Sequence, residues 1–224
     1  MVLTQSISNH TDAMGKLSRL LSYPARWRRS KGFGVHSPFA YSFITGVLTQ
    51  TECAYYAYGE IAAFCPRARK AGFNEIFAGR DMSIAEAHLV FRILCHFNPT
   101  QIVEMGHGHE VTNTLFRNAV PRARVLHWVE GRSLDLQPSE CKTFVLVNQL
   151  VGDELTAAAE VIGTLLADEN CVIVVRNLSC FPGQREAWNR IAASDYAGMG
   201  FTDGHIGIFV AEKGLPHCIY DLVL

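Results

Sequence analysis

The sequence contains no long unbroken apolar run, and no stretch approaches the roughly 18–20 apolar residues of a membrane span. Residues 1–30 lack the apolar run and small-residue cleavage site of a secretory signal peptide, so we expect a cytoplasmic protein without a membrane partner. An excess of charge of one sign is also lacking, because the net charge at pH 7 is −1. We therefore expect no binding to nucleic acid or to anionic lipid through the field of the whole chain.

Metal-binding cysteine motifs are absent as well. The seven cysteines are scattered and include no C-x-x-C pair, which argues against a zinc site. Cys95 and Cys171 lie inside apolar runs, as small buried side chains do in proteins of a reducing compartment. The cysteines therefore predict no metal.

Apolar residues, in contrast, are abundant: they make up 49% of the 224 residues, enough for one continuous core. The length fits a single α/β domain with an N-terminal extension better than two full domains. We place a helical extension at 1–98 and the main domain at 99–224, and we expect one compact unit from about residue 30.

The N-terminal extension begins with polar and then basic residues, and a helix is predicted over 12–29. Its cations allow two interpretations: contact with phosphate or nucleic acid, or a solvated helix that packs on the domain or on a partner chain. We favour the second. Next, Ser37-Pro38 predicts a helix start, because serine caps free N–H groups and proline in the first turn loses no hydrogen bond. For His36, just before this cap, we favour fixing of the turn over catalysis.

From residue 99 onward, short apolar strands alternate with helices, which is typical of a parallel sheet with both faces covered. The predicted strands are Gln101–Met105, Val125–Val129, Thr143–Val147, Cys171–Val175, Gly207–Ala211 and one near Cys218–Leu224. Helices are predicted at 53–70, 82–97, 111–118, 153–167 and 184–193. The predicted fold class is α/β, a Rossmann-like, doubly wound, mostly parallel sheet of about six strands with an N-terminal helical extension.

The segment IVEMGHGHEVTN, at 102–113, carries the most chemical information. A strand ends in Glu104 and turns through Gly106 and Gly108 into a helix, so the backbone can pass close to a ligand at a helix N-terminus. A second strand ends in another acid, Glu130, at the place where nucleotide-binding α/β folds hold a ribose. The order of strand, turn, helix and strand predicts a nucleoside site.

These two acids and the glycine turn resemble motifs I and II of class I SAM-dependent methyltransferases. More narrowly, the segments GVHSPFAYSFI, FRILCHFNPTQIVEMG and AWNRI…GFTDGHIGIFV are similar to methyltransferase-like proteins common in Bacteroidetes. The resemblance implies SAM as cofactor, with Glu104 and the glycine turn beside its methionine end and Glu130 at its ribose. The residues expected at the cofactor are Glu104, Gly106, His107, Gly108, Glu130 and Asn148.

The chain departs from the family pattern in three places. Glu110 stands where the family has a third glycine, which adds a negative charge near Glu104. Thirteen residues separate Glu130 from Phe144, too few for the usual helix–strand–helix insertion, so the third strand of the family's sheet should be missing. The acids that follow the fourth and fifth strands of related O-methyltransferases are replaced, by Val147-Asn148-Gln149 and Arg176-Asn177-Leu178.

Two function hypotheses stay open from the sequence. The first is a SAM-dependent methyltransferase-like protein that binds SAM or a related nucleoside and methylates a small acceptor by positioning, with no metal and no assigned catalytic residue. The second is a catalytically inactive descendant that acts as an interaction or assembly module, for example as a homodimer. A metal site at His107, His109 and Glu110 is disfavoured, because two histidines spaced i, i+2 in a loop form no standard site.

Overall fold

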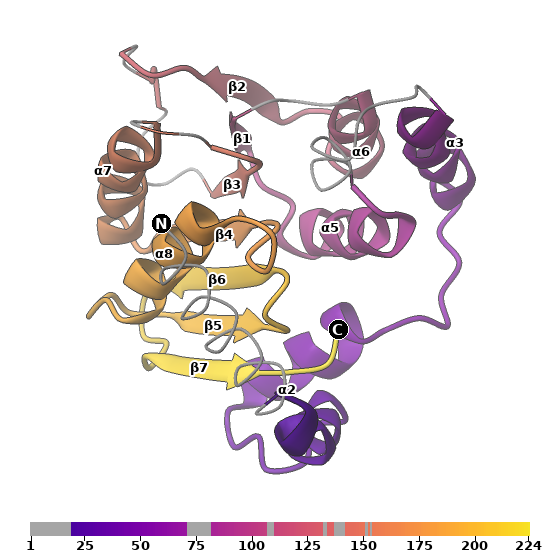
Figure 1. The fold of residues 1–224 in the computed structure, drawn as a ribbon, viewed down its shortest axis with the longest axis vertical. Helices are drawn as coiled ribbons and strands as arrows, with labels where there is room; N and C mark the ends of the chain where they lie inside the picture. Colours follow the sequence, from indigo (N-terminus) through magenta and orange to yellow (C-terminus); the bar gives the residue numbers. More distant parts are fainter. Residues whose placement is uncertain are drawn as a thin grey trace, which may run out of the picture.

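A computed structural model describes residues 19–70, 82–106, 110–131, 134–136, 142–150, 152 and 154–224. These residues form an α/β protein with a seven-stranded sheet in the order β2-β1-β3-β4-β6-β5-β7 (Figure 1). The strands are β1 (Gln101–Met105), β2 (Arg124–Trp128), β3 (Thr143–Val147), β4 (Asn170–Val175), β5 (Met199–Thr202), β6 (Gly207–Glu212) and β7 (Cys218–Asp221). The sheet is mixed but mostly parallel, because β6 alone runs antiparallel to its neighbours β4 and β5.

Helices precede the sheet and alternate with its strands. An N-terminal helix covers residues 19–30. It is followed by α2 (Pro38–Phe43), the π-helical turn η1 (Ile44–Leu48), α3 (Tyr58–Lys70), α5 (Ile84–Phe97), α6 (Glu110–Ala119), α7 (Glu154–Ala167) and α8 (Pro182–Ala192). None of the described helices combines the length and the apolar character that crossing a bilayer demands.

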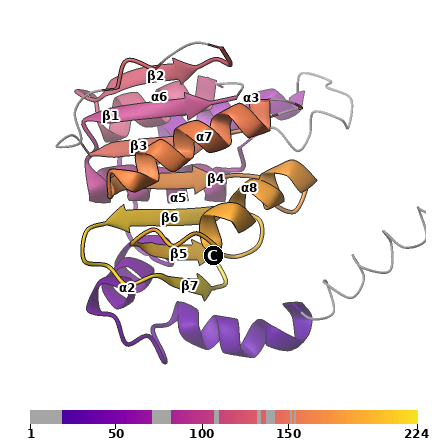
Figure 2. The ribbon, with the colours of Figure 1, turned by 90° about the vertical axis from the view of Figure 1, so that its left-hand side faces the viewer.

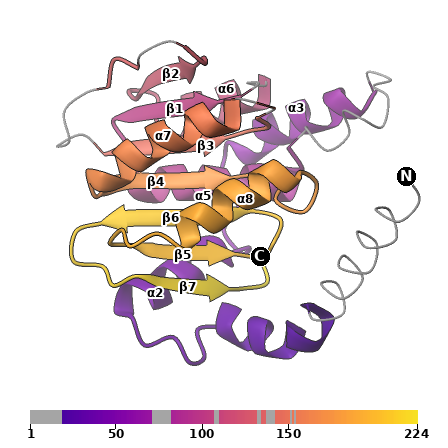
Figure 3. The ribbon, with the colours of Figure 1, turned by 60° about the vertical axis from the view of Figure 1, so that its left-hand side comes forward.

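The helices cover both faces of the sheet (Figures 2 and 3). Helices α7 and α8 lie on one face, and α5 and α6 lie on the other. Alternate residues of each central strand face the two layers, so that Ile102 and Phe144 join the core under α5 and α6 while Val103 and Val145 join the core under α7 and α8. Burial on both sides explains the almost wholly apolar central strands.

The N-terminal segment shares the first of these cores. Phe43 packs edge-on against Phe201 of β5, with ring centroids 5.1 Å apart, and against Phe97 of α5 at 5.3 Å. The start of α2 is capped as expected, because the Ser37 hydroxyl accepts a hydrogen bond from the Ala40 N–H at 3.2 Å. Residues before and after position 98 therefore contribute to one hydrophobic core.

The N-terminal helix is attached to the far end of the chain by Arg26. Its guanidinium donates hydrogen bonds to the Asp221 carboxylate at 2.9 Å, to the Asp203 carbonyl at 3.1 Å and to the Leu222 carbonyl. The side chain is only 9% exposed, so these contacts are largely shielded from water. Residues 19–30 thus pack against β7 and the β5–β6 turn. Positions 12–18 of the helix predicted over 12–29 lie outside the described residues.

The strand predictions match the sheet except at its end. Strands β1 and β3 have the predicted bounds, and β2 and β4 begin one residue earlier than predicted. The prediction of about six strands was wrong, because it missed β5, Met199–Thr202. Gly198 and Gly200 interrupt the apolar pattern there, and β5 is stabilised by pairing with β6 and β7 rather than by its own β propensity.

Candidate functional site

The strand order changes direction between β1 and β3, at the centre of the parallel part of the sheet. The chain leaves β1 toward β2 on one side and returns to place β3 on the other side of β1. In open α/β sheets, the loops after two such strands diverge and leave a crevice at their carboxyl ends. Glu104 is the penultimate residue of β1, and Asn148 directly follows β3, so both lie at this point.

Glu104 is buried, with 1% of its surface exposed, and it is held from one side. The Asn148 amide donates a hydrogen bond from Nδ2 to Glu104 Oε1 at 2.8 Å. The second carboxylate oxygen, Oε2, lies 3.1 Å from Nδ1 of His127 on β2, but the two groups are not aligned for a hydrogen bond. Among the described residues, Glu104 therefore keeps one buried oxygen that accepts no hydrogen bond.

A line of polar side chains continues from Asn148 to α5. Arg176, which follows β4 and is completely buried, donates from Nη1 to Asn148 Oδ1 at 2.9 Å. The same guanidinium donates from Nε and Nη2 to the two oxygens of Glu86, in the first turn of α5, at 2.6 Å and 3.2 Å. The Glu86 carboxylate compensates the buried charge of Arg176 and supplies the paired geometry that a guanidinium prefers.

Other buried polar groups at the same edge lack partners. In the part of the chain that the structure describes, Gln149 Oε1, Asn177 Nδ2 and Gln184 Oε1 make no hydrogen bond. They follow β3, follow β4 and lie in α8, respectively. A buried polar group without a partner costs about 1–3 kcal/mol, and in proteins water or a ligand commonly satisfies it. The carboxyl edge of the sheet therefore holds buried donors and acceptors that make no hydrogen bond within the described residues.

The packing of the chain itself explains why position 106 is a glycine. The sequence suggested that this glycine lets the backbone approach a ligand. In the structure, its φ is +80°, and a Cβ there would lie 2.4 Å from the carbonyl oxygen of Gln149. Just beside it, the Asn148 N–H donates to the Met105 carbonyl at 2.9 Å. Glycine is thus required where the loop after β3 passes over the end of β1.

The remaining residues that the sequence placed at a cofactor are only partly described. Glu130 is exposed in the turn after β2. Strand β2 is the parallel neighbour of β1, and its His127 lies opposite Glu104. His107, Gly108 and His109 lie outside the described residues, and so does the side chain of Glu110, the first residue of α6. The disfavoured metal site at these positions therefore stays untested. Elsewhere in the described chain, no three His, Cys, Asp or Glu side chains gather as metal ligands do.

Sequence reasoning missed the part that Glu86 and Gln184 play. Gln184, which is fully buried, donates from Nε2 to the Asn148 carbonyl and, at 3.4 Å, to the Arg176 carbonyl. Glu86 reads in the sequence as one more polar residue in the first turn of an amphipathic helix. The local signal that could have pointed to these residues is Arg176 itself, because an arginine that ends a buried strand needs an acid from another element.

Asn148 binds protein groups on both sides, so its amide group holds Glu104 in place and is itself engaged within the protein. Among the described residues, this edge holds a carboxylate oxygen that accepts no hydrogen bond, further amide groups without partners and an exposed acid two residues past β2. When the chain was compared with protein-family models, with curated proteins and with solved structures, none of the three comparisons found a match.

Proposed function

We propose that the chain is a Rossmann-like, SAM-dependent-methyltransferase-like protein that binds SAM or a related nucleoside where the strand order reverses. One observation carries the proposal: Glu104 is a buried acid at that point, and its Oε2 accepts no hydrogen bond from the described residues. Ligands of open α/β sheets bind at this edge, outside the carboxyl ends of the strands. A buried carboxylate with one oxygen that accepts no hydrogen bond, and only the imidazole of His127 beside it, favours a ligand with a cationic group.

The chemistry of SAM fits these residues. Its methionine end carries an ammonium group and a sulfonium, and both are cations that a carboxylate attracts. Glu130 would accept the ribose hydroxyls, since it follows the strand next to β1 and its side chain is exposed. In the sheet formed by the described residues, β2 is an edge strand, which agrees with loss of the third strand of the family's sheet.

Bound SAM would supply an electrophilic methyl group. The chain's own residues would position it: Asn148 holds Glu104, and Arg176 holds Asn148. Neither the amide nor the guanidinium, at the ends of β3 and β4, accepts a proton at neutral pH. Methyl transfer would therefore depend on placing the methyl group beside an acceptor that is already nucleophilic.

The fully buried contact between Arg176 and Asn148 favours a second candidate function. Related O-methyltransferases carry acids where this chain has these two residues, and here both side chains are bonded within the protein. A protein that keeps the fold and a nucleoside site but lacks turnover would have this arrangement. It would act as a ligand-responsive interaction module, for example as a homodimer.

The test is calorimetry with SAM and with its demethylated product. We expect binding that weakens by roughly tenfold or more in Glu104→Gln, because the ligand's cation loses its carboxylate partner. Glu160→Gln, a change at an exposed acid on α7, is the matched control. Absence of binding at millimolar ligand would refute the SAM proposal.

The two candidate functions differ in turnover. Incubation with methyl-labelled SAM and a library of small nucleophiles should transfer label if the protein is an enzyme. Binding without transfer, together with a change of molar mass in light scattering on addition of ligand, would support the interaction module. A strict monomer with and without SAM would remove that candidate.

A further inference from the structure

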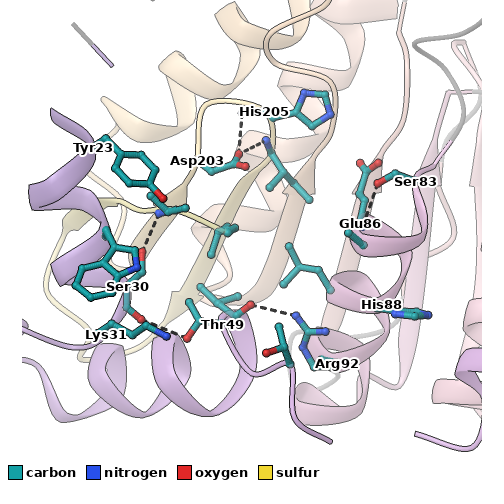
Figure 4. A pocket seen from close by; sticks show the side chains of 18 of the residues that line it. Tyr23, Ser30, Lys31, Thr49, Ser83, Glu86, His88, Arg92, Asp203 and His205 are labelled. Carbon is teal, nitrogen blue, oxygen red and sulfur yellow. Dashed lines mark hydrogen bonds between the residues drawn. The ribbon is translucent and has the colours of Figure 1, made fainter. Parts of the chain in front are cut away.

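A cavity lies away from Glu104, on the side of the sheet that carries α5. Its volume is about 580 Å³, within the range of small-molecule sites. The walls come from the N-terminal helix, from the end of η1 and the loop after it, from α5 and from the β5–β6 turn (Figure 4). Tyr58 of α3 and the residues Val223 and Leu224 after β7 complete them. Glu104, Asn148 and Glu130 do not line it, and Glu86, which does, has both carboxylate oxygens bonded to Arg176, so the cavity needs an explanation of its own.

Arg92 of α5 places a buried positive charge at this cavity. The residue is 8% exposed, and its guanidinium donates to the Val47 carbonyl at 2.7 Å, the Leu48 carbonyl at 3.0 Å and the Tyr58 hydroxyl at 3.2 Å. All three acceptors are neutral, and they engage three of the five N–H donors of the guanidinium. No carboxylate among the described residues pairs with it. A buried charge without a counter-ion is costly, so this site favours an anion.

The other charged side chains that line the cavity leave Arg92 without a carboxylate partner. Lys31 lies at the same end as Arg92 and Thr49 in Figure 4, and no described side chain pairs with it. Glu86 also lines the cavity, but both of its oxygens are engaged by Arg176. Asp203 sits at the opposite end on the β5–β6 turn, where its Oδ1 accepts the N–H groups of His205 and Ile206.

The rest of the lining is largely apolar. Leu89 and Ile206 are buried side chains of the wall, and Trp27 on the N-terminal helix is 47% exposed. A half-exposed indole at a cavity can cover a flat apolar ligand group without blocking entry. The cavity thus combines a cationic end with an apolar and aromatic wall, the two features that recognise an amphipathic organic anion.

We propose that this cavity binds a small organic anion with an apolar ring, whose carboxylate contacts Arg92 and Lys31 and whose ring packs against Trp27, Leu89 and Ile206. The carboxylate supplies the negative charge that Arg92 lacks. The proposal is independent of the proposed function, because none of these residues belongs to the nucleoside site.

The probe is 4-fluorophenylacetate, followed by fluorine NMR line broadening and by tryptophan fluorescence, because Trp27 is the one of the three tryptophans that lines the cavity. The matched ligand is 4-fluorophenylacetamide, which has nearly the same shape and no charge. We expect the carboxylate to bind roughly tenfold or more tightly than the amide, as hydrogen bonds to a charged group predict. Inorganic phosphate, which lacks a ring, should bind more weakly than the carboxylate.

Variants then locate the site. Lys31→Met and Arg92→Gln should each weaken binding of the carboxylate several-fold and leave binding of the amide unchanged. Arg28→Met, a change on the N-terminal helix at a residue that does not line the cavity, should have no effect. If Arg92→Gln does not fold, Lys31→Met decides alone, since Lys31 is exposed. Equal affinity for carboxylate and amide, no binding at millimolar concentration, or an unaffected Lys31→Met variant would each overturn the proposal.

If the anion proposal is refuted, the SAM proposal is unaffected, and refutation of the SAM proposal leaves the anion proposal unaffected. Lys31→Met should bind SAM as the unchanged protein does, and Glu104→Gln should bind 4-fluorophenylacetate as the unchanged protein does. Displacement of the fluorinated probe by SAM would place both ligands in one site and contradict the independence of the two.

Discussion

Arg176 and Glu86 form a bidentate ion pair whose side chains are 0% and 7% exposed. The pair connects the end of β4 to the first turn of α5, two elements that are 90 residues apart in the chain. In such a place each charge depends on the other, because neither is compensated by water. The line from Glu86 through Arg176 and Asn148 to Glu104 therefore contributes to stability as well as to the candidate nucleoside site.

Removal of one partner of this pair should be strongly destabilising. We expect Glu86→Ala to lower the free energy of unfolding by about 3–5 kcal/mol, because it leaves the Arg176 charge buried and uncompensated. Chemical denaturation measures the change. The control is Glu186→Ala, which breaks the exposed pair with Arg190 and should cost less than about 1 kcal/mol.

A double variant tests the cause of that loss. Glu86→Leu combined with Arg176→Met removes both charges and keeps apolar volume, so it should recover most of the stability lost in Glu86→Ala. A double variant as unstable as Glu86→Ala would show that packing or the contact with Asn148, rather than an unpaired charge, is the cause.

Gly106 should tolerate no side chain. Gly106→Ala combines a left-handed φ with a Cβ 2.4 Å from the Gln149 carbonyl oxygen, and we expect a loss of roughly 2–5 kcal/mol. Gly131 has a similar φ of +76° but open space around a Cβ, so Gly131→Ala should lose only about 1–2 kcal/mol. Thermal unfolding of the two variants separates steric contact from backbone strain. Equal losses would contradict the assigned role of the Gln149 carbonyl.

The N-terminal helix should detach locally when Arg26 is replaced. Arg26→Met removes hydrogen bonds to Asp221 and to the carbonyls of Asp203 and Leu222, which together should be worth at least about 1.5–3 kcal/mol. Hydrogen exchange of residues 19–30 should accelerate roughly tenfold or more while exchange in β1 and β3 stays slow. Arg28→Met is the control, because the Arg28 side chain is exposed and lies over the ring of Phe33. Uniform acceleration throughout the chain would instead indicate global destabilisation.

Two histidines should make stability fall in mild acid. Burial lowers the pKa of His88, and the nearby Arg92 adds to this effect, while burial and then Lys142 lower the pKa of His96. A pKa below the ordinary 6.5 means that the unfolded state binds protons first. The stability these groups contribute is present above pH 6.5 and is lost as the pH falls below it.

Denaturation curves at about pH 7.5 and about pH 5.5 measure this difference. His88→Phe keeps a flat ring to stack on Tyr58, whose centroid lies 3.6 Å from that of His88, and removes the titrating group. Its stability should therefore fall less between the two pH values than that of the unchanged protein. His36→Gln, at an exposed histidine, is the control. An undiminished pH dependence in His88→Phe would contradict the role of this residue.

Much of the fold followed from local pattern. The apolar runs at β1 and β3 and the Ser37-Pro38 cap placed those elements correctly, because strand burial and helix capping depend on neighbouring residues. β5 was missed, because Gly198 and Gly200 weaken its own signal and its stability comes from β6 and β7. An element that depends on pairing partners is invisible to a local pattern.

In the candidate site, too, some features could be predicted from the sequence and others depend on the tertiary structure. The position of Glu104 near the carboxyl end of a buried strand could be predicted from the sequence alone, because it follows an apolar run and precedes a glycine turn. The pairing of Arg176 with Glu86, and the passage of the Gln149 carbonyl over Gly106, could not. Those contacts depend on which strands become neighbours and on how α5 lies across them. The folded chain therefore decides which charges are compensated by a carboxylate and which, like that of Arg92, are bonded only to neutral groups of the described residues.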